Sequence, residues 1–377
     1  MTADDRTRTM RVVVCGTNFG RIYLSALART TRPFQLAGIL ARGSERSKAC
    51  AERYGVPLYT SVDRLPEDID AACVVVNSGI NGGAGGRLAV ELMDRGLHVL
   101  QEHPVHEAEL ADCLRAARRA GVVYRLNTLY PHVAPVRRFL AAGRALLAEQ
   151  RPLFVDATYA VQVAYPLFDI LERLLGGVRP WQFDQPVATG GPFDPAVKAP
   201  PFRSLDGVLA GVPLSLRVQH QMDPVEPDNH IHLLHRISLG TEGGVLTLAH
   251  THGPVLFSPR LHRPPSAADV PDLAEAAGSA LDLPSATVLG PATAPTHRQV
   301  LARLWPDAVE RALVELRTAV LAGTDPLRDG RRHLAAGRVW AKANALLGAP
   351  DLMSHRPPVP VDPTLLTAAV AALDDER

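Results

Sequence analysis

The sequence predicts an α/β protein with an N-terminal doubly wound parallel sheet and a C-terminal α+β domain whose open sheet is mainly antiparallel. Within residues 11–127, short apolar runs bounded by Gly, Pro or Asn alternate with segments of helical periodicity, which is typical of buried parallel strands. After about residue 130, strand-like segments follow one another without crossover helices. We therefore predict two domains, residues 1–129 and 130–377, with the last helices able to pack back on the first domain.

Individual elements follow from the same patterns. The expected parallel strands are residues 12–15, 35–41, 71–77, 97–101 and 122–127. Amphipathic helices are expected at 47–54 and 86–95, after Pro166, and at 307–322 and 331–347, mostly with a glycine at the end. In the second domain, strands are expected at 215–220, 230–239 and 244–250. Residues 262–297, rich in Pro, Ala and Ser, predict a long surface excursion.

Composition excludes several classes of function. The 40 basic residues nearly cancel the 39 acidic ones, so the net charge of +1 gives no support for a nucleic-acid or anionic-membrane partner. The four cysteines lie far apart and form no CxxC pair, which argues against zinc and against a disulfide framework. The start MTADDRTRTM has no apolar signal segment, and no apolar run reaches the length of a membrane span. We therefore expect a cytoplasmic protein.

Fourteen histidines raise the question of a metal site. His230 and His232 would share one strand face, and so would His250 and His252. Such pairs form a metal site only if carboxylates or a third histidine converge on them. We assign these histidines structural or solvated roles and predict no metal.

A glycine-bearing turn after the first strand is the candidate dinucleotide site. Its residues are Gly16, Thr17, Asn18, Phe19 and Gly20. A strand, a tight turn and a helix place a pyrophosphate at the helix N-terminus. The G-x-G-x-x-G pattern is incomplete, because Asn18 and Arg21 occupy its second and third glycine positions, but Asn tolerates a positive φ. The alternative is an ordinary turn between a strand and a helix, and the repeated β/α alternation downstream favours the dinucleotide.

The end of the second strand predicts the cofactor. A carboxylate there would bind the ribose of NAD and repel a 2′-phosphate, and this strand tip has none. Donors to a phosphate are available from Arg42, Gly43, Ser44 and Arg46. Glu45 is expected to point into solvent, and the alternative role of Ser44 is a helix N-cap. The sequence thus favours NADPH over NADH.

Several segments carry a resemblance to a known family. They include CGTNFGRIYLSAL, LYTS, GGAGG, QEHPVH, NTLYPH and PDNHIHLLHR. The chain resembles the Gfo/Idh/MocA oxidoreductases, which pair a Rossmann domain with an open α/β domain. Where those proteins usually carry E-K-P, this chain has Glu102-His103-Pro104, and where they often carry H-x-x-D it has Pro166 and Asp169. These departures count against sugar oxidation. One branch of the family shares them, the thiazolinyl imine reductases of siderophore assembly lines. The chain resembles this branch over most of residues 11–260.

The resemblance implies a substrate and partners. NADPH would deliver hydride to the C=N carbon of a thiazoline ring and give a thiazolidine. The substrate would be thioester-linked to a carrier protein of a nonribosomal peptide synthetase, as in pyochelin- or yersiniabactin-like pathways. Relatives of this type often dimerise through the open sheet, so a homodimer is implied as well.

Tyr130 and His103 are the candidate proton donors. Reduction of an imine needs a proton on nitrogen, and an acid within hydrogen-bond reach lowers the barrier. A tyrosine is protonated at neutral pH, while a histidine titrates near neutrality and could donate or recharge Tyr130. Both residues follow strand ends on the ligand-binding edge of the sheet. The alternatives are that His103 only shapes a loop with Pro104 and that Tyr130 packs at the domain hinge.

Other residues are expected around these two. The nicotinamide side of the cofactor is expected to contact Asn77, Ser78, Gly82, Gly83, Glu102 and His103, although turn formation is the alternative for the first four. The residues expected to border the substrate are Asn127, Thr128 and Asp169. Asp169 has the alternative of capping its helix near the N-terminus. Two other functions stay open: a sugar, inositol or other alcohol dehydrogenase, and a catalytically silent NADP-binding sensor or scaffold.

Overall fold

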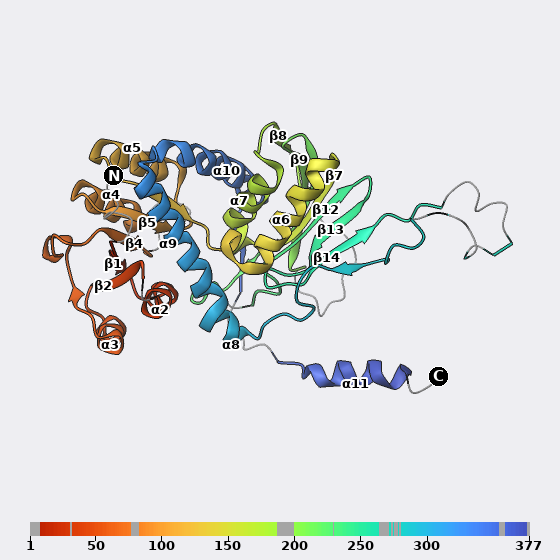
Figure 1. The fold of residues 1–377 in the computed structure, drawn as a ribbon, viewed down its shortest axis with the longest axis horizontal. Helices are drawn as coiled ribbons and strands as arrows, with labels where there is room; N and C mark the ends of the chain where they lie inside the picture. Colours follow the sequence, from red (N-terminus) through yellow and green to blue (C-terminus); the bar gives the residue numbers. More distant parts are fainter. Residues whose placement is uncertain are drawn as a thin grey trace.

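The first sheet of the computed structural model has six parallel strands in the order β3-β2-β1-β4-β5-β6 (Figure 1). The structure describes residues 8–30, 32–76, 83–186, 200–228, 230–263, 271–272, 274, 278, 280–353 and 359–374. The strands are β1 (Met10–Cys15), β2 (Phe34–Leu40), β3 (Leu58–Tyr59), β4 (Ala71–Val74), β5 (His98–Glu102) and β6 (Tyr124–Asn127). The order reverses between β1 and β4, and ligands of such sheets bind outside the carboxyl ends at that point. The predicted doubly wound parallel sheet is confirmed.

The strands of this sheet form because both of their faces are covered. Val12, Val13 and Val14 have no exposed surface, and every residue of β4 is buried. The covering helices are α2 (Gly20–Arg29), α3 (Glu45–Tyr54), α4 (Ala84–Asp94) and α5 (Glu107–Ala120). Helices α3 and α4 begin two residues before their predicted starts. For α3 the reason is Ser44, whose side chain accepts from the Ser47 N–H and so caps the first turn.

The second sheet has eight strands in the order β15-β14-β13-β12-β7-β10-β9-β8, and only the β7–β10 pair is parallel. Its strands are β7 (Pro152–Ala160), β8 (Trp181–Phe183), β9 (Phe202–Leu209), β10 (Val212–Gln219), β12 (His235–Thr241), β13 (Gly244–Leu248), β14 (Val255–Pro259) and β15 (Thr287–Val288). Figure 1 shows α6 (Ala134–Glu149) and α7 (Ala164–Leu175) against one face of this sheet. The predicted mainly antiparallel sheet is confirmed.

The predicted strand at 230–239 is shorter in the structure and corrects one histidine pairing. His230 has a φ of 64°, a left-handed conformation that breaks an extended run, and β12 starts only at His235. His230 and His232 therefore do not lie on one strand face. His250 and His252 follow the end of β13 and are not strand neighbours either.

The last helices pack back on the first domain. Helix α9 (Trp305–Ala322) contacts α2 and β5, while α10 (Pro326–Leu347) contacts α5 and α7 (Figure 1). Helix α10 begins five residues before its predicted start, because the Asp325 side chain accepts from the Leu327 N–H. The remaining elements are η1 (Val62–Arg64), η2 (Tyr130–His132), η3 (Val161–Val163), β11 (Gln221–Met222), α8 (His297–Gln299), η6 (Val300–Leu304), β16 (Asp351–Leu352) and α11 (Pro363–Asp374). Within the described ranges, no helix is long and apolar enough to cross a membrane.

Two predictions about organisation stay open. The domain boundary between residues 129 and 130 falls between the end of β6 and the short helix η2. The predicted excursion 262–297 lies partly outside the described residues, and its described part includes β15, which pairs with β14.

Candidate active site

The turn after β1 requires a glycine at its first position. Gly16 has a φ of 94°, and a Cβ there would lie 2.5 Å from the carbonyl oxygen of Val75. Its N–H donates to the Leu40 carbonyl at 2.9 Å, which ties the turn to β2. Asn18 does not have a positive φ, so our expectation that Asn serves this turn through its left-handed tolerance is wrong. The turn needs that conformation only at Gly16.

Helix α2 begins directly after this turn and leaves its N-terminus open. Phe19 is the N-cap residue and makes no side-chain capping bond, and the first turn carries no acidic residue. A Cβ on Gly20 would meet Val14 at 3.5 Å, so the helix packs closely on β1. Free N–H groups and the positive end of the helix dipole favour an anion such as a pyrophosphate.

The tip of β2 carries exposed positive charge. Arg42 and Arg46 are exposed and pair with no described carboxylate. Ser44 has the predicted alternative role of N-cap, while Gly43 has a φ of 83°. Glu45 is 91% exposed and pairs with Lys48 at 2.7 Å. The two arginines are thus available to a phosphate.

The segment after β4 lies mostly outside the described residues, and Asn77, Ser78 and Gly82 fall there. Gly83 is described, and its N–H donates to the Glu109 carboxylate at 2.7 Å. These cofactor contacts stay predictions.

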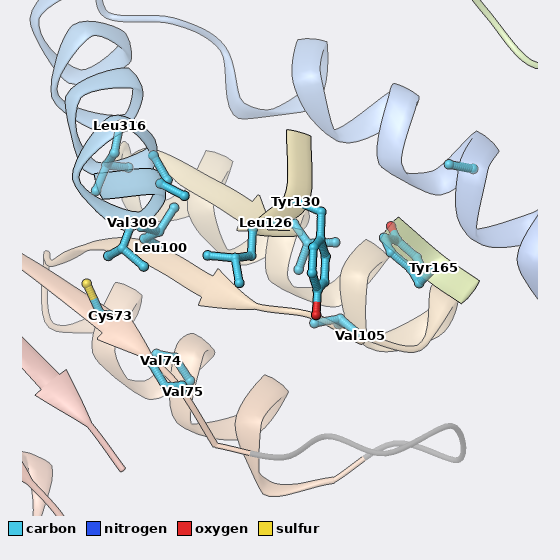
Figure 2. Packing of buried hydrophobic residues seen from close by; sticks show 14 of the residues in the cluster. Cys73, Val74, Val75, Leu100, Val105, Leu126, Tyr130, Tyr165, Val309 and Leu316 are labelled. Atoms are coloured by element: carbon cyan, nitrogen blue, oxygen red, sulfur yellow. The ribbon is translucent and has the colours of Figure 1, made fainter. Parts of the chain in front are cut away.

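His103 and Tyr130 come together at the carboxyl edge of the first sheet. His103 follows β5 directly, and its backbone N–H donates to the Asn127 carbonyl at 3.0 Å. The His103 ring lies 6.3 Å from the Tyr130 ring and stacks on Tyr165 at the same distance. Figure 2 shows Tyr130 and Val105 beyond the tips of the parallel strands. The two predicted proton donors therefore share one apolar site.

A strained turn places Tyr130. Leu129 has a φ of 58° and a ψ of −60°, and the Tyr130 N–H donates to the Thr128 carbonyl at 2.6 Å. This is a γ-turn of the rare, strained kind. The Asn127 side chain holds it by accepting from the Leu129 N–H at 3.0 Å. Strain of this sort persists where the surroundings fix the backbone, typically at functional sites.

Burial changes the expected acid chemistry of this pair. Burial, with His235 acting in the same direction and Asp169 opposing, lowers the pKa of His103 to about 3. Our expectation that His103 titrates near neutrality is therefore wrong, because its imidazolium would lose its water. Burial, together with Asp228 and Glu102, raises the pKa of Tyr130 above its usual value. Both rings are neutral at physiological pH.

Beside this pair, Glu102 sits in a buried hydrogen-bond network. The Tyr23 hydroxyl donates to Glu102 Oε2 and accepts from Asn127 Nδ2 at 2.6 Å. The other oxygen, Oε1, lies 3.3 Å from His103 Nε2. Burial raises the pKa of Glu102 to about 8, although the Tyr23 bond opposes the rise. The predicted cofactor contact of Glu102 stays open, and in the structure its carboxyl has protein partners.

The residues predicted to border the substrate also have protein partners. The Thr128 hydroxyl donates to Asp169, whose carboxylate pairs with Arg173 at 3.0 Å and lies 3.8 Å from Arg332. Asp169 is fully buried in the second turn of α7, so the alternative of an N-terminal cap is wrong. Direct substrate contact by Asn127, Thr128 and Asp169 stays a prediction, and a ligand would have to replace these partners.

Three residues that the sequence did not single out complete the site. Tyr23 lies in the quoted segment that contains the turn, and His235 is the last histidine of the segment PDNHIHLLHR, but nothing in their spacing reveals burial. His235 packs edge-on against Tyr130 at 5.0 Å, and its Nε2 lies 2.9 Å from the Val163 carbonyl. Trp305 packs against Phe19 at 5.8 Å, which joins α9 to the dinucleotide turn.

Histidine clustering does not produce a metal centre in the described residues. The rings of His250 and His252 lie 5.0 Å apart, and His252 Nε2 accepts from the Trp305 indole at 3.3 Å. Across the described part of the chain, no group of three or more His, Cys, Asp or Glu side chains is arranged to hold a metal ion.

Comparison with known proteins covers both domains. Residues 10–128 match the model of the oxidoreductase family with an NAD-binding Rossmann fold, the Gfo/Idh/MocA family. Residues 150–258 match the model described as thiazolinyl imine reductase Irp3-like, C-terminal. No curated protein sequence matches the chain.

Solved structures show the same fold at low identity. UDP-N-acetylglucosamine 3-dehydrogenase from Acidithiobacillus ferrooxidans is 17% identical, with a TM-score of 0.60 over 90% of this chain and 99% of that one. A 3-ketoreductase from Actinomadura kijaniata in complex with NADP is 16% identical, with a TM-score of 0.61 over 92% and 99%. A dehydrogenase from Chromobacterium violaceum is 14% identical, with a TM-score of 0.63 over 98% and 99%.

Proposed function

Because this chain belongs to the Gfo/Idh/MocA oxidoreductases and carries an Irp3-like C-terminal domain, we propose that it reduces the C=N bond of a thiazoline to a thiazolidine with NADPH. The substrate is a thioester-linked intermediate on a carrier protein of a nonribosomal peptide synthetase, in a siderophore-type pathway. The observation that carries the proposal is the match of residues 150–258 to the thiazolinyl imine reductases. The geometry of the carboxyl edge supports it.

The residues around the first turn fit a dinucleotide with a 2′-phosphate. A Cβ at Gly16 would fill the space beside the Val75 carbonyl, and the N-terminus of α2 has no side-chain cap. A pyrophosphate would bind there, and the 2′-phosphate would bind Arg42, Arg46 and Ser44. When bound, NADPH supplies the hydride that the imine carbon accepts.

The chain itself supplies the proton and excludes water. A thiazoline nitrogen is weakly basic, so a donor in hydrogen-bond reach is needed as negative charge develops on it. Tyr130 keeps its phenolic proton, and neutral His103 carries one ring N–H, so either can donate. Tyr165 and Val105 add buried apolar surface beside these donors. Such surroundings strengthen each hydrogen bond to the reacting nitrogen.

Sugar or polyol oxidation is the second candidate within the same family. The 3-dehydrogenase and the 3-ketoreductase named above share the fold, which by itself carries no substrate. His103 stands where Gfo/Idh/MocA proteins usually carry the lysine of E-K-P, and Pro166 stands in place of the histidine of their H-x-x-D. These two residues therefore favour thiazoline reduction over sugar or polyol oxidation.

The proposal is tested by following NADPH absorbance with a soluble thiazoline thioester and with the thiazoline loaded on its carrier protein. We expect NADPH consumption and a product heavier by two hydrogens, with slower consumption of NADH. Parallel assays with nucleotide sugars and polyols serve as the comparison. Turnover of those compounds without thiazoline turnover would establish the second candidate instead.

The proton donors are tested by Tyr130→Phe and His103→Ala. Loss of a positioned acid lowers turnover by about 100-fold. NADPH binding measured by fluorescence should not change in Tyr130→Phe, while in His103→Ala it also tests the predicted nicotinamide contact. Unchanged turnover in both variants would remove these residues from the chemistry. A wild-type protein that binds NADPH but reduces no substrate would support the silent sensor.

A further inference from the structure

Among the residues that the structure describes, the buried carboxyl of Glu102 has no lysine or arginine partner. Its only ion-pair contact among the described residues is His103, with Nε2 3.3 Å from Oε1. Its other oxygen, Oε2, accepts from the Tyr23 hydroxyl, and Asn127 Nδ2 lies 3.4 Å away. A buried carboxylate is costly without a cation, so the geometry favours the protonated acid.

The contacts of Glu102 assign each proton in this network: a hydrogen bond at Oε2 and a 3.3 Å contact between Oε1 and His103 Nε2. Oε2 accepts a hydrogen bond from the Tyr23 hydroxyl. The acidic proton of Glu102 therefore belongs on Oε1, which faces His103 Nε2. Nε2 must then be the acceptor, which places the ring proton of neutral His103 on Nδ1. His103 Nδ1 is buried and has no hydrogen-bond partner in the described residues. A ligand nitrogen that reached this buried donor beside Tyr130 would give it the hydrogen-bond partner that it lacks.

We propose that Glu102 stores the proton for the imine nitrogen and delivers it through His103, with Tyr23 as the residue that positions the Glu102 carboxyl. The proposal rests on the proposed function and identifies the origin of its proton.

The step balances without a charged histidine. As hydride reaches the imine carbon, the C=N π pair takes the proton from His103 Nδ1 and forms the N–H bond. His103 Nε2 takes the Oε1 proton at the same time, so the ring only changes tautomer and Glu102 becomes a carboxylate. The Tyr23 hydroxyl and Asn127 Nδ2 stabilise that carboxylate. After product release, a proton from water returns to Glu102.

The surroundings of the network leave Glu102 as the group that titrates near pH 8. The titratable groups that face Glu102 are Tyr23 from α2, Cys73 from β4, His103 after β5 and Tyr130 from η2. Burial raises the pKa of the two tyrosines and the thiol well above pH 8, and it lowers the pKa of His103 to about 3. Those facing His103 from other elements are Tyr130 in η2, Tyr165 and Asp169 in α7 and His235 in β12. Burial raises the pKa of Tyr165 well above its usual value. Asp169 stays ionised and His235 neutral, since their pKa values are lowered.

Turnover with a soluble thiazoline thioester and saturating NADPH, measured from pH 6 to pH 10, tests the proposal. We expect wild-type turnover to fall above about pH 8, the pKa to which burial raises Glu102. Glu102→Gln should lose about 100-fold in kcat, as for removal of a general acid, and should lose the fall with pH. Its KM for NADPH is measured alongside kcat, because it reports the predicted cofactor contact of Glu102.

Tyr23→Phe provides a second variant that keeps the carboxyl. The Tyr23 bond lowers the pKa of Glu102, so its loss should move the fall in turnover to higher pH. The matched control is Tyr124→Phe, which removes another buried tyrosine hydroxyl, one on β6 that donates to the Gln101 side chain at 2.8 Å. The control should keep the wild-type pH profile. A wild-type profile in Tyr23→Phe and Glu102→Gln would overturn the proposal while leaving thiazoline reduction intact.

An infrared measurement on the NADP-bound protein separates this proposal from the proposed function. A protonated carboxyl band present at pH 7, absent in Glu102→Gln and titrating near pH 8 supports the proton store. If that band is found and no thiazoline is reduced, the proposed function is wrong, but Glu102 still holds an exchangeable proton. If the wild-type and Glu102→Gln spectra agree at pH 7, Glu102 is ionised and the proposal is overturned.

Discussion

Two buried carboxyl groups at one end of the first sheet have opposite environments. Glu102, at the end of β5, is held by the neutral groups of Tyr23 and Asn127, and burial raises its pKa to about 8. Asp169, in α7, is held by Thr128 and by the guanidinium of Arg173 at 3.0 Å. Burial alone would raise the pKa of Asp169, but its charged neighbours hold that pKa well below the usual range.

The contrast indicates a division of roles. When the environments of two titratable groups push their pKa values apart, one group can keep a fixed charge while the other holds an exchangeable proton. Asp169 is a permanent anion in α7 that accepts a hydrogen bond from Thr128, the residue directly after β6. Glu102 has a proton to give near physiological pH. The carboxyl group of Asp169 has a structural role because it is paired with a cation, Arg173. The carboxyl group of Glu102 can take part in proton transfer because it has no such cation among the described residues.

The largest expected effect is on stability, from Asp169→Asn. The variant leaves the mostly buried Arg173 without the carboxylate of Asp169, so the free energy of unfolding should fall by about 3–5 kcal/mol. Urea denaturation at pH 7 measures it. Glu45→Gln, which breaks the exposed pair with Lys48, is the control and should cost about 1 kcal/mol or less. Equal losses in the two variants would remove the distinction between a buried and a surface ion pair here.

The pH dependence of stability should have opposite signs at the two carboxyls. The folded pKa of Asp169 is depressed, so its contribution is present above the unfolded pKa of about 3.9 and is lost as pH falls. The folded pKa of Glu102 is raised, so its contribution is present below the unfolded pKa of about 4.3 and is lost as pH rises through about 8.

The Glu102→Gln variant tests directly whether Glu102 makes the folded protein less stable as pH rises. Between pH 5 and pH 7, wild-type stability should fall relative to Glu102→Gln by roughly 1.4 kcal/mol per pH unit, because only the unfolded carboxyl loses its proton there. Urea denaturation across this range gives the difference. Parallel curves for the two proteins would mean that Glu102 is ionised when folded and that the contrast with Asp169 does not exist.

The smallest expected effect comes from Thr128→Val, which keeps the shape and removes the hydroxyl bonded to Asp169. Loss of one hydrogen bond to a charged group should lower the free energy of unfolding by about 1.5 kcal/mol. The fall of turnover with pH should stay where it is in the wild type, because Thr128 does not contact Glu102. A shifted pH profile would show that the two carboxyls act as one coupled system.

Local pattern was enough to predict much of this molecule. Buried apolar runs predicted the parallel sheet, and strand ends predicted that His103 and Tyr130 share an edge, since the carboxyl ends of parallel strands meet there. The protonation of His103 could not be predicted, because it depends on burial among other elements, with Tyr165 stacked on the ring, and on the nearby His235. Tyr23 was missed for the same reason: it meets Glu102 across 79 residues of sequence.

The turns, too, could be predicted only in part from the sequence. Gly16 has the positive φ expected of the first glycine, but the residue that is strained at the site is Leu129, which no composition rule predicts. Its γ-turn is held by a side chain of the preceding strand, Asn127. Tertiary contacts of this kind override local propensity, and they are concentrated where Tyr130 is placed.

Hydride transfer from cofactor to substrate is the central claim, and an isotope experiment tests it most directly. The wild-type protein is incubated in ordinary water with carrier-bound thiazoline and NADPH deuterated at the transferring position of its nicotinamide. We predict a thiazolidine with one deuterium on the former imine carbon and an ordinary proton on nitrogen. A thiazolidine without deuterium, or unchanged thiazoline beside intact cofactor, would contradict the proposed function.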